Sequence, residues 1–359
     1  MVALFKDILG AGESLVKNED ALDFEYVPKL LPFRENQQHA IAACINPLLQ
    51  GRNGRNALIY GSPGIGKTAA TRWVLRDLEE ESDEVVPLYI NCWQKNTSHK
   101  IVIEICNLLG YAFVQNKRTE ELFEIVKNIL NKKQAVFVLD EIDKLEEQEI
   151  IYSILNDIYK KSVLLIANSK QIFDELDERI KSRLTPEILE FKQYNKNEVT
   201  EILRQRVGYA FVPGCWQDDA LRFIADKAFE KADVRAGIYL LREAGLAAEE
   251  QSSKRITLEH AEKAVSKLAN FTIKNSAELA DETRAILEIV KEYSGKKIGE
   301  LFEMYKRKNG DASYKTFQRA IDKLAKGKFV ELNKTSGGSE GNTTIVSYAK
   351  TKTLNEFGN

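Results

Sequence analysis

The chain has 359 residues, which is too long for one compact core and predicts two or three domains. Hydrophobic residues make up 43% of it and charged residues 30%, a composition typical of globular proteins that excludes intrinsic disorder. The formal net charge of -2 excludes a general attraction to nucleic acid or membrane, so any nucleic-acid contact must come from a local patch.

The first twenty residues, MVALFKDILGAGESLVKNED, lack the basic start and long apolar run of a signal peptide. No stretch approaches the roughly 20 apolar residues of a membrane helix. The four cysteines (44, 92, 106 and 215) are scattered and lack the paired spacing of a disulfide framework or zinc site. We therefore expect a cytoplasmic protein with reduced thiols and no membrane contact.

In chain order, the segment YVPKLLPFREN is punctuated by prolines and precedes a helical run, ENQQHAIAACINPLLQ. NALIYG is a predicted strand, and the helix KTAATRWVLRDLEEE follows it. Further strands, VVPLYINC, AVFVLDEI and SVLLIANS, alternate with the helices TSHKIVIEICNLLGY and TEELFEIVKNILNKK. Thr97 or Ser98 is the expected N-cap of the first of these helices. Continuous apolar strands alternating with helices predict an α/β fold with a parallel sheet covered on both faces. After about Phe191 the strands stop, and residues 195–270 are predicted to be helical only.

The turn after the first strand carries a phosphate-loop motif. GSPGIGKT matches G-x-x-x-x-G-K-[ST] between a strand and a helix, the context this motif requires. Its glycines let successive N–H groups point at phosphate oxygens, and the helix adds its positive dipole end. We expect Lys67 to reach the β- and γ-phosphates of ATP and Thr68 to bind magnesium. The expected nucleotide-binding residues of this loop are Gly61, Ser62, Pro63, Gly64, Ile65, Gly66, Lys67, Thr68 and Ala69.

A second nucleotide motif is AVFVLDEID, an apolar strand that ends in acids. Asp140 is expected to support Mg²⁺, and Glu141 to polarise the water that attacks the γ-phosphate. The alternative is that both acids cap the following helix. Asp143 is left unassigned.

Two further polar residues are candidates for the chemistry of hydrolysis. Asn168 ends the strand SVLLIANS, where its amide can orient the attacking water; the alternative is that it caps a turn. Arg235 lies in the helical region and can reach the γ-phosphate if that region folds over the site. The alternative for Arg235 is a solvated or ion-paired side chain.

The C-terminal part is predicted to be a winged helix, a variant of the helix-turn-helix. TRAILEIVKEYSG, KKIGELFEMYKRKNG and SYKTFQRAIDKLAKGKFV are the predicted helices, the last capped by Ser313, and VELNKT and TTIVSYA the strands of a wing. The third helix is expected to enter the major groove of DNA, with Lys306, Arg307 and Lys308 meeting phosphates. Ordinary solvated lysines, on a winged helix that binds protein, are the alternative. The expected DNA-binding residues are Tyr314, Lys315, Gln318, Arg319 and Lys334.

Together these motifs resemble the AAA+ ATPases, and within them the archaeal origin-recognition and replication-licensing initiators. These are relatives of the origin recognition complex large subunit and of the cell-division-cycle loading factor. The resemblance spans nearly the whole chain. The nucleotide motifs are widely shared, whereas YVP…LPFRE, the INC…T segment and LDERIKSRL are more specific to this family.

The resemblance implies roles for several residues. Asn168 would be sensor 1, Arg235 sensor 2, and Arg183, with Arg179 as its rival, would act on the ATP of a neighbouring subunit. Sensor 2 is often preceded by Gly-Asp, whereas Ala232 and Asp233 precede it here, which bears on the geometry of the lid. Lys95 and Lys100 lie in the region of an initiator-specific helical insertion that would touch DNA backbone. The residues implied to line the adenine pocket are Tyr26, Val27, Pro28 and Arg34.

The resulting prediction is an α/β AAA+ base with a P-loop and parallel sheet at residues 1–192, an all-helical lid at 193–275 and a winged-helix DNA-binding domain at 276–359. The resemblance implies a nucleoid-associated, ATP-dependent initiator that uses ATP/ADP and Mg²⁺ and hydrolyses slowly, as a switch. Its expected partners are double-stranded origin DNA, the replicative helicase and other initiator copies. The alternatives are a signalling or regulatory ATPase whose winged helix binds protein, and a plasmid or transcriptional regulator of the same fold.

Overall fold

The computed structural model describes residues 14–274, 281–308, 313–326, 330–335 and 343–348. The chain forms two compact units, divided after Val265. The first unit holds the sheet and the helices that follow it, and the second holds the C-terminal helices and strands. None of the described helices is long and apolar enough to cross a membrane.

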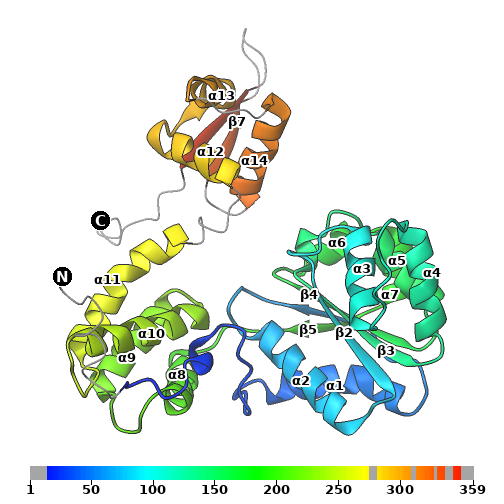
Figure 1. Ribbon diagram of the computed structural model, residues 1–359, viewed down its shortest axis with the longest axis horizontal. Coiled ribbons are helices and arrows are strands. Elements are labelled where there is room, and N and C mark those ends of the chain that lie inside the picture. The colour runs from blue at the N-terminus through cyan, green and yellow to red at the C-terminus, as the bar shows by residue number, and fades with distance from the viewer. Residues whose placement is uncertain (1–13, 275–280, 309–312, 327–329, 336–342, 349–359) are drawn as a thin grey trace, which may run out of the picture. The chain divides into compact units, whose positions relative to one another are not determined.

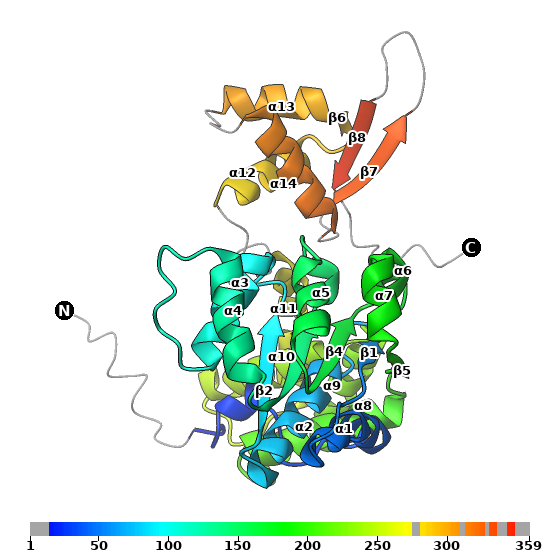
Figure 2. The ribbon, with the colours of Figure 1, turned by 90° about the vertical axis from the view of Figure 1, so that its right-hand side faces the viewer.

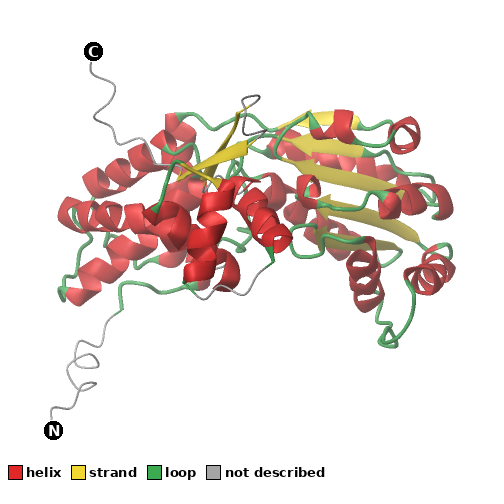
Figure 3. Ribbon diagram, turned by 90° about the horizontal axis from the view of Figure 1, so that it is seen from above, coloured by secondary structure: helices red, strands yellow, loops and turns green. Residues whose placement is uncertain are grey.

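The first unit is built on a five-stranded, all-parallel sheet in the order β2-β3-β4-β1-β5, which confirms the α/β prediction. The central strands β3 and β4 are buried along almost their whole length, as their continuous apolar sequences require. Figure 1 shows α1 and α2 on one face of the sheet and α3 to α7 on the other, and Figure 3 shows the strands of the sheet side by side among the helices. The strands are β1 (Ala57–Tyr60), β2 (Val85–Asn91), β3 (Gln134–Asp140), β4 (Lys161–Ala167) and β5 (Glu187–Glu190).

The helices of the base follow the predicted pattern. Thr97, rather than Ser98, is the N-cap of α3, and its side chain accepts the backbone N–H of Lys100. Helices α3, α4, α5 and α7 turn apolar residues toward the sheet, and together with residues of β1 to β4 they form one continuous core. The helices are α1 (Glu35–Leu49), α2 (Lys67–Glu81), α3 (Ser98–Leu108), α4 (Thr119–Leu130), α5 (Glu149–Asp157), α6 (Ile172–Glu175) and α7 (Glu178–Leu184), with short 3-10 turns η1 (Asp20–Leu22) and η2 (Ile142–Lys144).

The helices after the sheet are α8 (Lys196–Ala210), α9 (Asp218–Glu230), α10 (Val234–Glu250) and α11 (Leu258–Lys274). A capping box between Asn195 and Glu198 starts α8. The N-terminal segment runs along these helices rather than along the sheet. Lys17 donates its backbone N–H to the carbonyl of Ala210 at 2.8 Å, and Arg206 donates to the carbonyl of Ala21 at 3.0 Å. The N-terminal segment is therefore attached to the lid helices before it reaches the base.

The second unit has the helices and antiparallel sheet of a winged helix (Figure 2). Its core contains Leu301, Phe317, Ile321 and Leu324. The elements are α12 (Asp281–Glu292), β6 (Lys296–Lys297), α13 (Ile298–Arg307), α14 (Tyr314–Lys326), β7 (Val330–Thr335) and β8 (Thr343–Tyr348), with the strands in the order β6-β8-β7.

One boundary in this unit was predicted wrongly. Lys296 and Lys297 were expected to start the second helix, but they form β6, which pairs with Val346 and Ile345 of β8. The N–H of Gly295 bonds to the carbonyl of Val346 at 2.9 Å, with φ of +86° at the glycine. The backbone is therefore paired with β8 up to Lys297, and α13 begins only at Ile298.

Candidate nucleotide-binding site

The loop between β1 and α2 is shaped by glycines in a backbone conformation that other residues rarely adopt. Gly64 has φ of +73° and Gly66 has φ of +91°. A Cβ atom at Gly64 would lie 1.9 Å from a carboxylate oxygen of Asp233, so no side chain fits there. Gly66 is also the N-cap of α2, whose N-terminus carries unpaired N–H groups and a positive dipole end. The loop therefore has the form of an anion-binding cradle.

Lys67, the first residue of α2, is buried with its ammonium inside this loop. Its Nζ donates to the carbonyls of Gly61 and Ser62 at 2.6 and 2.9 Å, and to Oδ1 of Asn168 at 3.3 Å. Burial lowers the pKa of Lys67 to about 8, against the opposing effect of the Asp140 charge. A phosphate placed in the loop would raise this pKa again, because its negative charge favours the ammonium.

Thr68 and Asp140 meet at the end of β3. The Thr68 hydroxyl donates to Oδ2 of Asp140 at 2.6 Å, and the backbone N–H of Glu141 donates to Oδ1 at 2.8 Å. Asp140 is 2% exposed, so its carboxylate is fixed by these bonds rather than by water. Hydroxyl and carboxylate oxygens are the hard donors that Mg²⁺ prefers, and they lie beside the phosphate cradle. These residues fit a magnesium ion bound with a nucleotide.

Glu141 follows directly and is held in an unfavourable backbone conformation, with φ of +54°. Non-glycine residues in this region are strained by roughly 1–3 kcal/mol and concentrate at functional sites. Glu141 precedes η2, but its side chain makes no capping bond there. Burial raises the pKa of Glu141, and the neighbouring charges of Asp140 and Asp143 raise it further. A raised pKa makes this carboxylate a stronger base.

Asn168, one residue beyond β4, lies between the lysine and an acid. Its Oδ1 accepts from Lys67, and its Nδ2 donates to Oδ1 of Asp143 at 3.4 Å. The described bonds of its side chain thus go to site residues and not to a turn. Asp143, which was left unassigned, also pairs with Lys144 at 3.2 Å.

Arg235 lies in the first turn of α10, and the start of this helix contacts the phosphate loop. The backbone N–H of Val234 donates to the carbonyl of Gly64 at 3.2 Å. The carboxylate of Asp233 binds the Arg235 guanidinium, with Nη2 to Oδ2 at 2.8 Å. Ala232 just before them has φ of +53°, the conformation for which a glycine at this position is suited. Sequence reasoning noted Asp233 only as a neighbour of Arg235 and missed its contact with Gly64.

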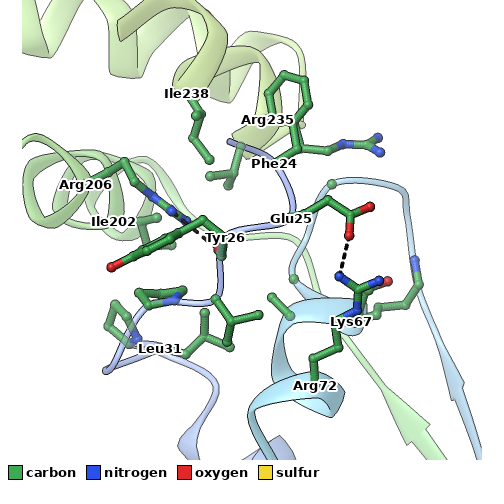
Figure 4. Close-up of a pocket in the computed structure, with 18 of the residues that line it drawn as sticks. Phe24, Glu25, Tyr26, Leu31, Lys67, Arg72, Ile202, Arg206, Arg235 and Ile238 are labelled. Atoms are coloured by element: carbon green, nitrogen blue, oxygen red, sulfur yellow. Dashed lines mark hydrogen bonds and ion pairs between the residues drawn. The ribbon is translucent and has the colours of Figure 1, made fainter. Parts of the chain in front are cut away.

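A pocket opens beside the loop, between the N-terminal segment, α2, the ends of β2 and β3, and helices α8 and α10. Tyr26, Val27 and Pro28 line it, as do Lys67, Thr68 and Ala69. Figure 4 shows Tyr26 beside Ile202 and Arg206, and Glu25 opposite Arg72. Sequence reasoning missed the lining residues Glu25, Arg72, Tyr89, Ile202, Gln205, Arg206, Tyr209 and Ile238. They belong to five separate segments and carry no motif, so only the fold brings them together.

Arg34 does not take the expected place among the residues that line this pocket. It is 4% exposed and lies behind the phosphate loop. Its Nε and Nη2 donate to the carbonyl of Ile65 at 3.1 and 3.0 Å, and Nη2 donates to the carbonyl of Lys192 at 2.7 Å. Its guanidinium also stacks on the ring of Tyr194, 3.8 Å from the centroid. A planar cation with several donors can bind two carbonyls at once, so Arg34 stabilises the conformation of the phosphate loop through Ile65.

The two arginines expected to act on a neighbouring subunit both lie in α7, and neither lines the pocket. Arg179 is bound by Asp177, with Nη2 to Oδ2 at 3.0 Å. Arg183 is exposed, and its guanidinium lies 5.3 Å from the centroid of the Tyr152 ring. Among the described contacts, Arg179 has a carboxylate partner and Arg183 has only the contact with the ring.

In the second unit, Tyr314, Lys315 and Arg319 are exposed on the N-terminal half of α14, and Gln318 is half-buried. Lys334 lies in β7 opposite Thr344; its side chain is outside the described residues. Of the lysines expected to meet phosphates, Lys308 is ion-paired with Glu292, and Lys306 lies over the Phe302 ring.

The two lysines of the possible second DNA surface are both engaged within the first unit. Lys95 pairs with Glu104 at 2.9 Å, and Lys100 donates to Oδ1 of Asn96 at 2.9 Å. Neither side chain is therefore simply free in solvent.

Comparison with known proteins places these features in a family. A profile described as an AAA domain matches residues 50–173, and one described as a Cdc6 AAA+ ATPase-type lid domain matches residues 200–266. The chain is 31% identical to "ORC1-type DNA replication protein 2" of Methanosarcina acetivorans, over 95% of both chains. It is 32% identical to the protein of that name from Methanothermobacter thermautotrophicus, over 95% of this chain and 94% of the relative.

Solved structures agree with this result. The Aeropyrum pernix ORC1 protein in complex with DNA superposes with a TM-score of 0.81 and 28% identity, over 94% of both chains. The A. pernix ORC2 protein, solved as ADPNP-ADP complexes, shares the fold with a TM-score of 0.63 and 20% identity. The phosphate loop lies in the segment matched by the AAA profile and the helix start that contacts Gly64 lies in the segment matched by the lid profile. The chain is thus an AAA+ ATPase, and it belongs to the ORC1/Cdc6-type family of DNA replication initiators.

Proposed function

We propose that this protein is an ATP-dependent initiator that binds origin duplex DNA and helps to recruit or load the replicative helicase. The observation that carries this proposal is the composition of the pocket wall. The N-terminal segment, α2 and the lid helices α8 and α10 all contribute to it, and α10 contacts Gly64 of the phosphate loop. A nucleotide in this pocket contacts the base and the lid at once. Whether ATP, ADP or no nucleotide is bound therefore changes which arrangement of lid and base is favoured.

The residues of the first unit have the following proposed roles in ATP hydrolysis. The adenine lies against Tyr26, Val27 and Pro28, and the loop amides and Lys67 hold the phosphates. Thr68 and Asp140 hold magnesium, which when bound neutralises charge on the triphosphate. Glu141 takes the proton from the water that attacks the γ-phosphorus, and the bond to the β-γ bridging oxygen breaks to leave ADP and phosphate.

The neighbours of this water stabilise the charge that develops. Asn168 orients the water through its amide, because its side chain already lies between Lys67 and Asp143. Arg235 exchanges its bond to Asp233 for the γ-phosphate, and Arg183 serves the site of another initiator copy. Because Arg235 must leave a bidentate carboxylate, hydrolysis is slow and works as a switch.

DNA binding is proposed for the second unit. The N-terminal half of α14 presents Tyr314, Lys315 and Arg319 to solvent, with Gln318 beside them and Lys334 in the wing strand β7. A third helix that presents its N-terminal half is the geometry by which helix-turn-helix proteins reach base edges in the major groove. The DNA complex of the similar A. pernix ORC1 protein supports this assignment.

The test is duplex binding by fluorescence anisotropy at several salt concentrations. Arg319→Ala is expected to weaken binding and lower the salt slope by about one, since one phosphate or base contact is lost. Arg222→Ala, which removes an equal charge from an exposed position of α9, is the matched control. Equal affinity of both variants and of Lys315→Ala would refute the α14 assignment.

The alternative is a regulatory ATPase, or a plasmid or transcriptional regulator, whose winged helix binds protein. The pairing of Lys308 with Glu292 favours it, because this pairing removes positive charge from the surface. The salt series separates the two hypotheses: affinity for duplex DNA that does not fall with salt excludes phosphate contacts and favours a protein partner.

A further inference from the structure

Tyr89 occupies a place in the nucleotide site that none of the roles above includes. It lies in β2, beside β3, and its side chain lines the pocket. Its hydroxyl donates to Oδ2 of Asp140 at 2.6 Å. Thr68 donates to that same oxygen, also at 2.6 Å. One carboxylate oxygen thus receives two short hydrogen bonds from opposite sides of the site.

The Asp140 carboxylate has few acceptor positions, and the hydrogen bond from Tyr89 occupies one of them. An ionised carboxylate offers about four lone-pair directions, two on each oxygen. Thr68 and Tyr89 take both directions on Oδ2, and the N–H of Glu141 takes one on Oδ1. Among the described contacts, a single direction on Oδ1 is left for a magnesium-bound water. The Tyr89 hydroxyl therefore decides how the carboxylate is turned and which lone pair it offers.

The ring of Tyr89 is itself held in place. The Arg72 guanidinium lies 4.4 Å from the ring centroid, and Arg72 forms a 2.7 Å ion pair with Glu25 of the N-terminal segment (Figure 4). The chain Glu25, Arg72, Tyr89, Asp140 thus links the segment that lines the adenine side to the metal side.

We propose that Tyr89 is a positioning residue for magnesium: its hydroxyl orients the Asp140 carboxylate so that one oxygen supports Thr68 while the other faces the hydrated ion. This inference rests on the magnesium role proposed for Thr68 and Asp140. Outer groups that orient metal-binding residues in this way typically change metal affinity when they are removed. In this role the hydroxyl acts through Asp140, so its loss is expected to alter the response to magnesium, while a phenylalanine keeps the ring that lines the pocket.

The test compares Tyr89→Phe with Tyr111→Phe, using a fluorescent ATP analogue and MgCl₂ as the probes. Tyr111 packs its ring against the core of the first unit, and its hydroxyl has no described partner, so its variant loses the same atom without the contact. Nucleotide affinity in EDTA is expected to equal that of the wild type in both variants. The magnesium concentration for half-maximal binding enhancement and turnover is expected to rise about 10–100-fold in Tyr89→Phe only.

Four outcomes are decisive. An unchanged magnesium dependence in Tyr89→Phe overturns the inference, and so does a fall in turnover at saturating magnesium without a change in that dependence. Asp140→Asn tests the magnesium role on which the inference rests. If this variant leaves the magnesium dependence unchanged, the assignment of Asp140 to magnesium is wrong. Arg72→Gln, which removes the cation above the ring but keeps the hydroxyl, is expected to shift the same constant by less. Should Tyr89→Phe not fold, an unshifted constant in Arg72→Gln overturns the inference.

Discussion

Lys67 gives the sharpest prediction, because its protonation is expected to change when a triphosphate binds. Burial lowers the pKa of this lysine to about 8 from its ordinary value of 10.5. The difference corresponds to roughly 3 kcal/mol by which burial disfavours the ammonium in the nucleotide-free protein. Phosphate oxygens favour the ammonium by direct charge, so the pKa rises again in the complex. Binding of ATP therefore takes up protons above pH 8.

The sign and the pH window follow from linkage. Between about pH 8 and 10.5 the unfolded chain keeps this proton and the folded chain has lost it, so this lysine makes folding more favourable as pH rises. Nucleotide affinity changes in the opposite direction. Near pH 7 the lysine is already charged; near pH 9 it is mostly neutral, and affinity falls by up to about tenfold per pH unit.

Isothermal titration calorimetry in pairs of buffers with different ionisation enthalpies measures the protons taken up. We expect about half a proton at pH 8 and nearly one at pH 9, with MgATP fully ionised at both. Lys67→Arg is the control, because a guanidinium stays charged when buried and binds its ligand without proton uptake. Equal proton uptake at pH 7 and pH 9 in the wild type would show that the lysine is not perturbed as the structure indicates.

Three further predictions concern folding and turnover. Ala232→Gly is expected to raise the midpoint of thermal unfolding, because an exposed alanine at φ of +53° costs about 1 kcal/mol that glycine does not incur; an unchanged or lower midpoint contradicts this. Arg34→Met is expected to lower the free energy of unfolding in urea by about 3 kcal/mol, since the buried carbonyl of Ile65 and the partly buried carbonyl of Lys192 lose their donors. A loss below about 0.5 kcal/mol, typical of surface substitutions, would show that Arg34 does not hold the loop. Glu141→Gln is expected to slow hydrolysis by roughly 10²–10⁴-fold while ATP binding persists. A rate of phosphate release equal to that of the wild type would exclude Glu141 as the base.

The sequence predicted those parts of the fold in which local signals agree. The apolar strands β1 to β4 are continuous and alternate with helices, and the glycine loop between β1 and α2 leaves little conformational choice. The edge strand β5 was not predicted, because its four residues alternate between half-buried and exposed and two of them are glutamates. The strand β6 has two lysines and exists only because β8 pairs with it.

The candidate site divides in a similar way. Lys67, Thr68, Asp140 and Glu141 lie in motifs whose spacing follows from one strand or one turn. Tyr89 carries no such signal, because its role depends on the neighbour of β2 in the sheet. The place of Arg34 was also beyond the sequence, since a basic residue after YVPKLLPF gives no indication that two backbone carbonyls from distant segments converge on it.

The claim on which the account rests is that the loop around Gly64 holds a triphosphate between base and lid. Equilibrium binding of a fluorescent ATP analogue to the wild type and to Lys67→Ala measures it most directly. The account predicts saturable binding by the wild type and loss of that binding in the variant, with the variant still folded by circular dichroism. Undiminished binding by folded Lys67→Ala would contradict it.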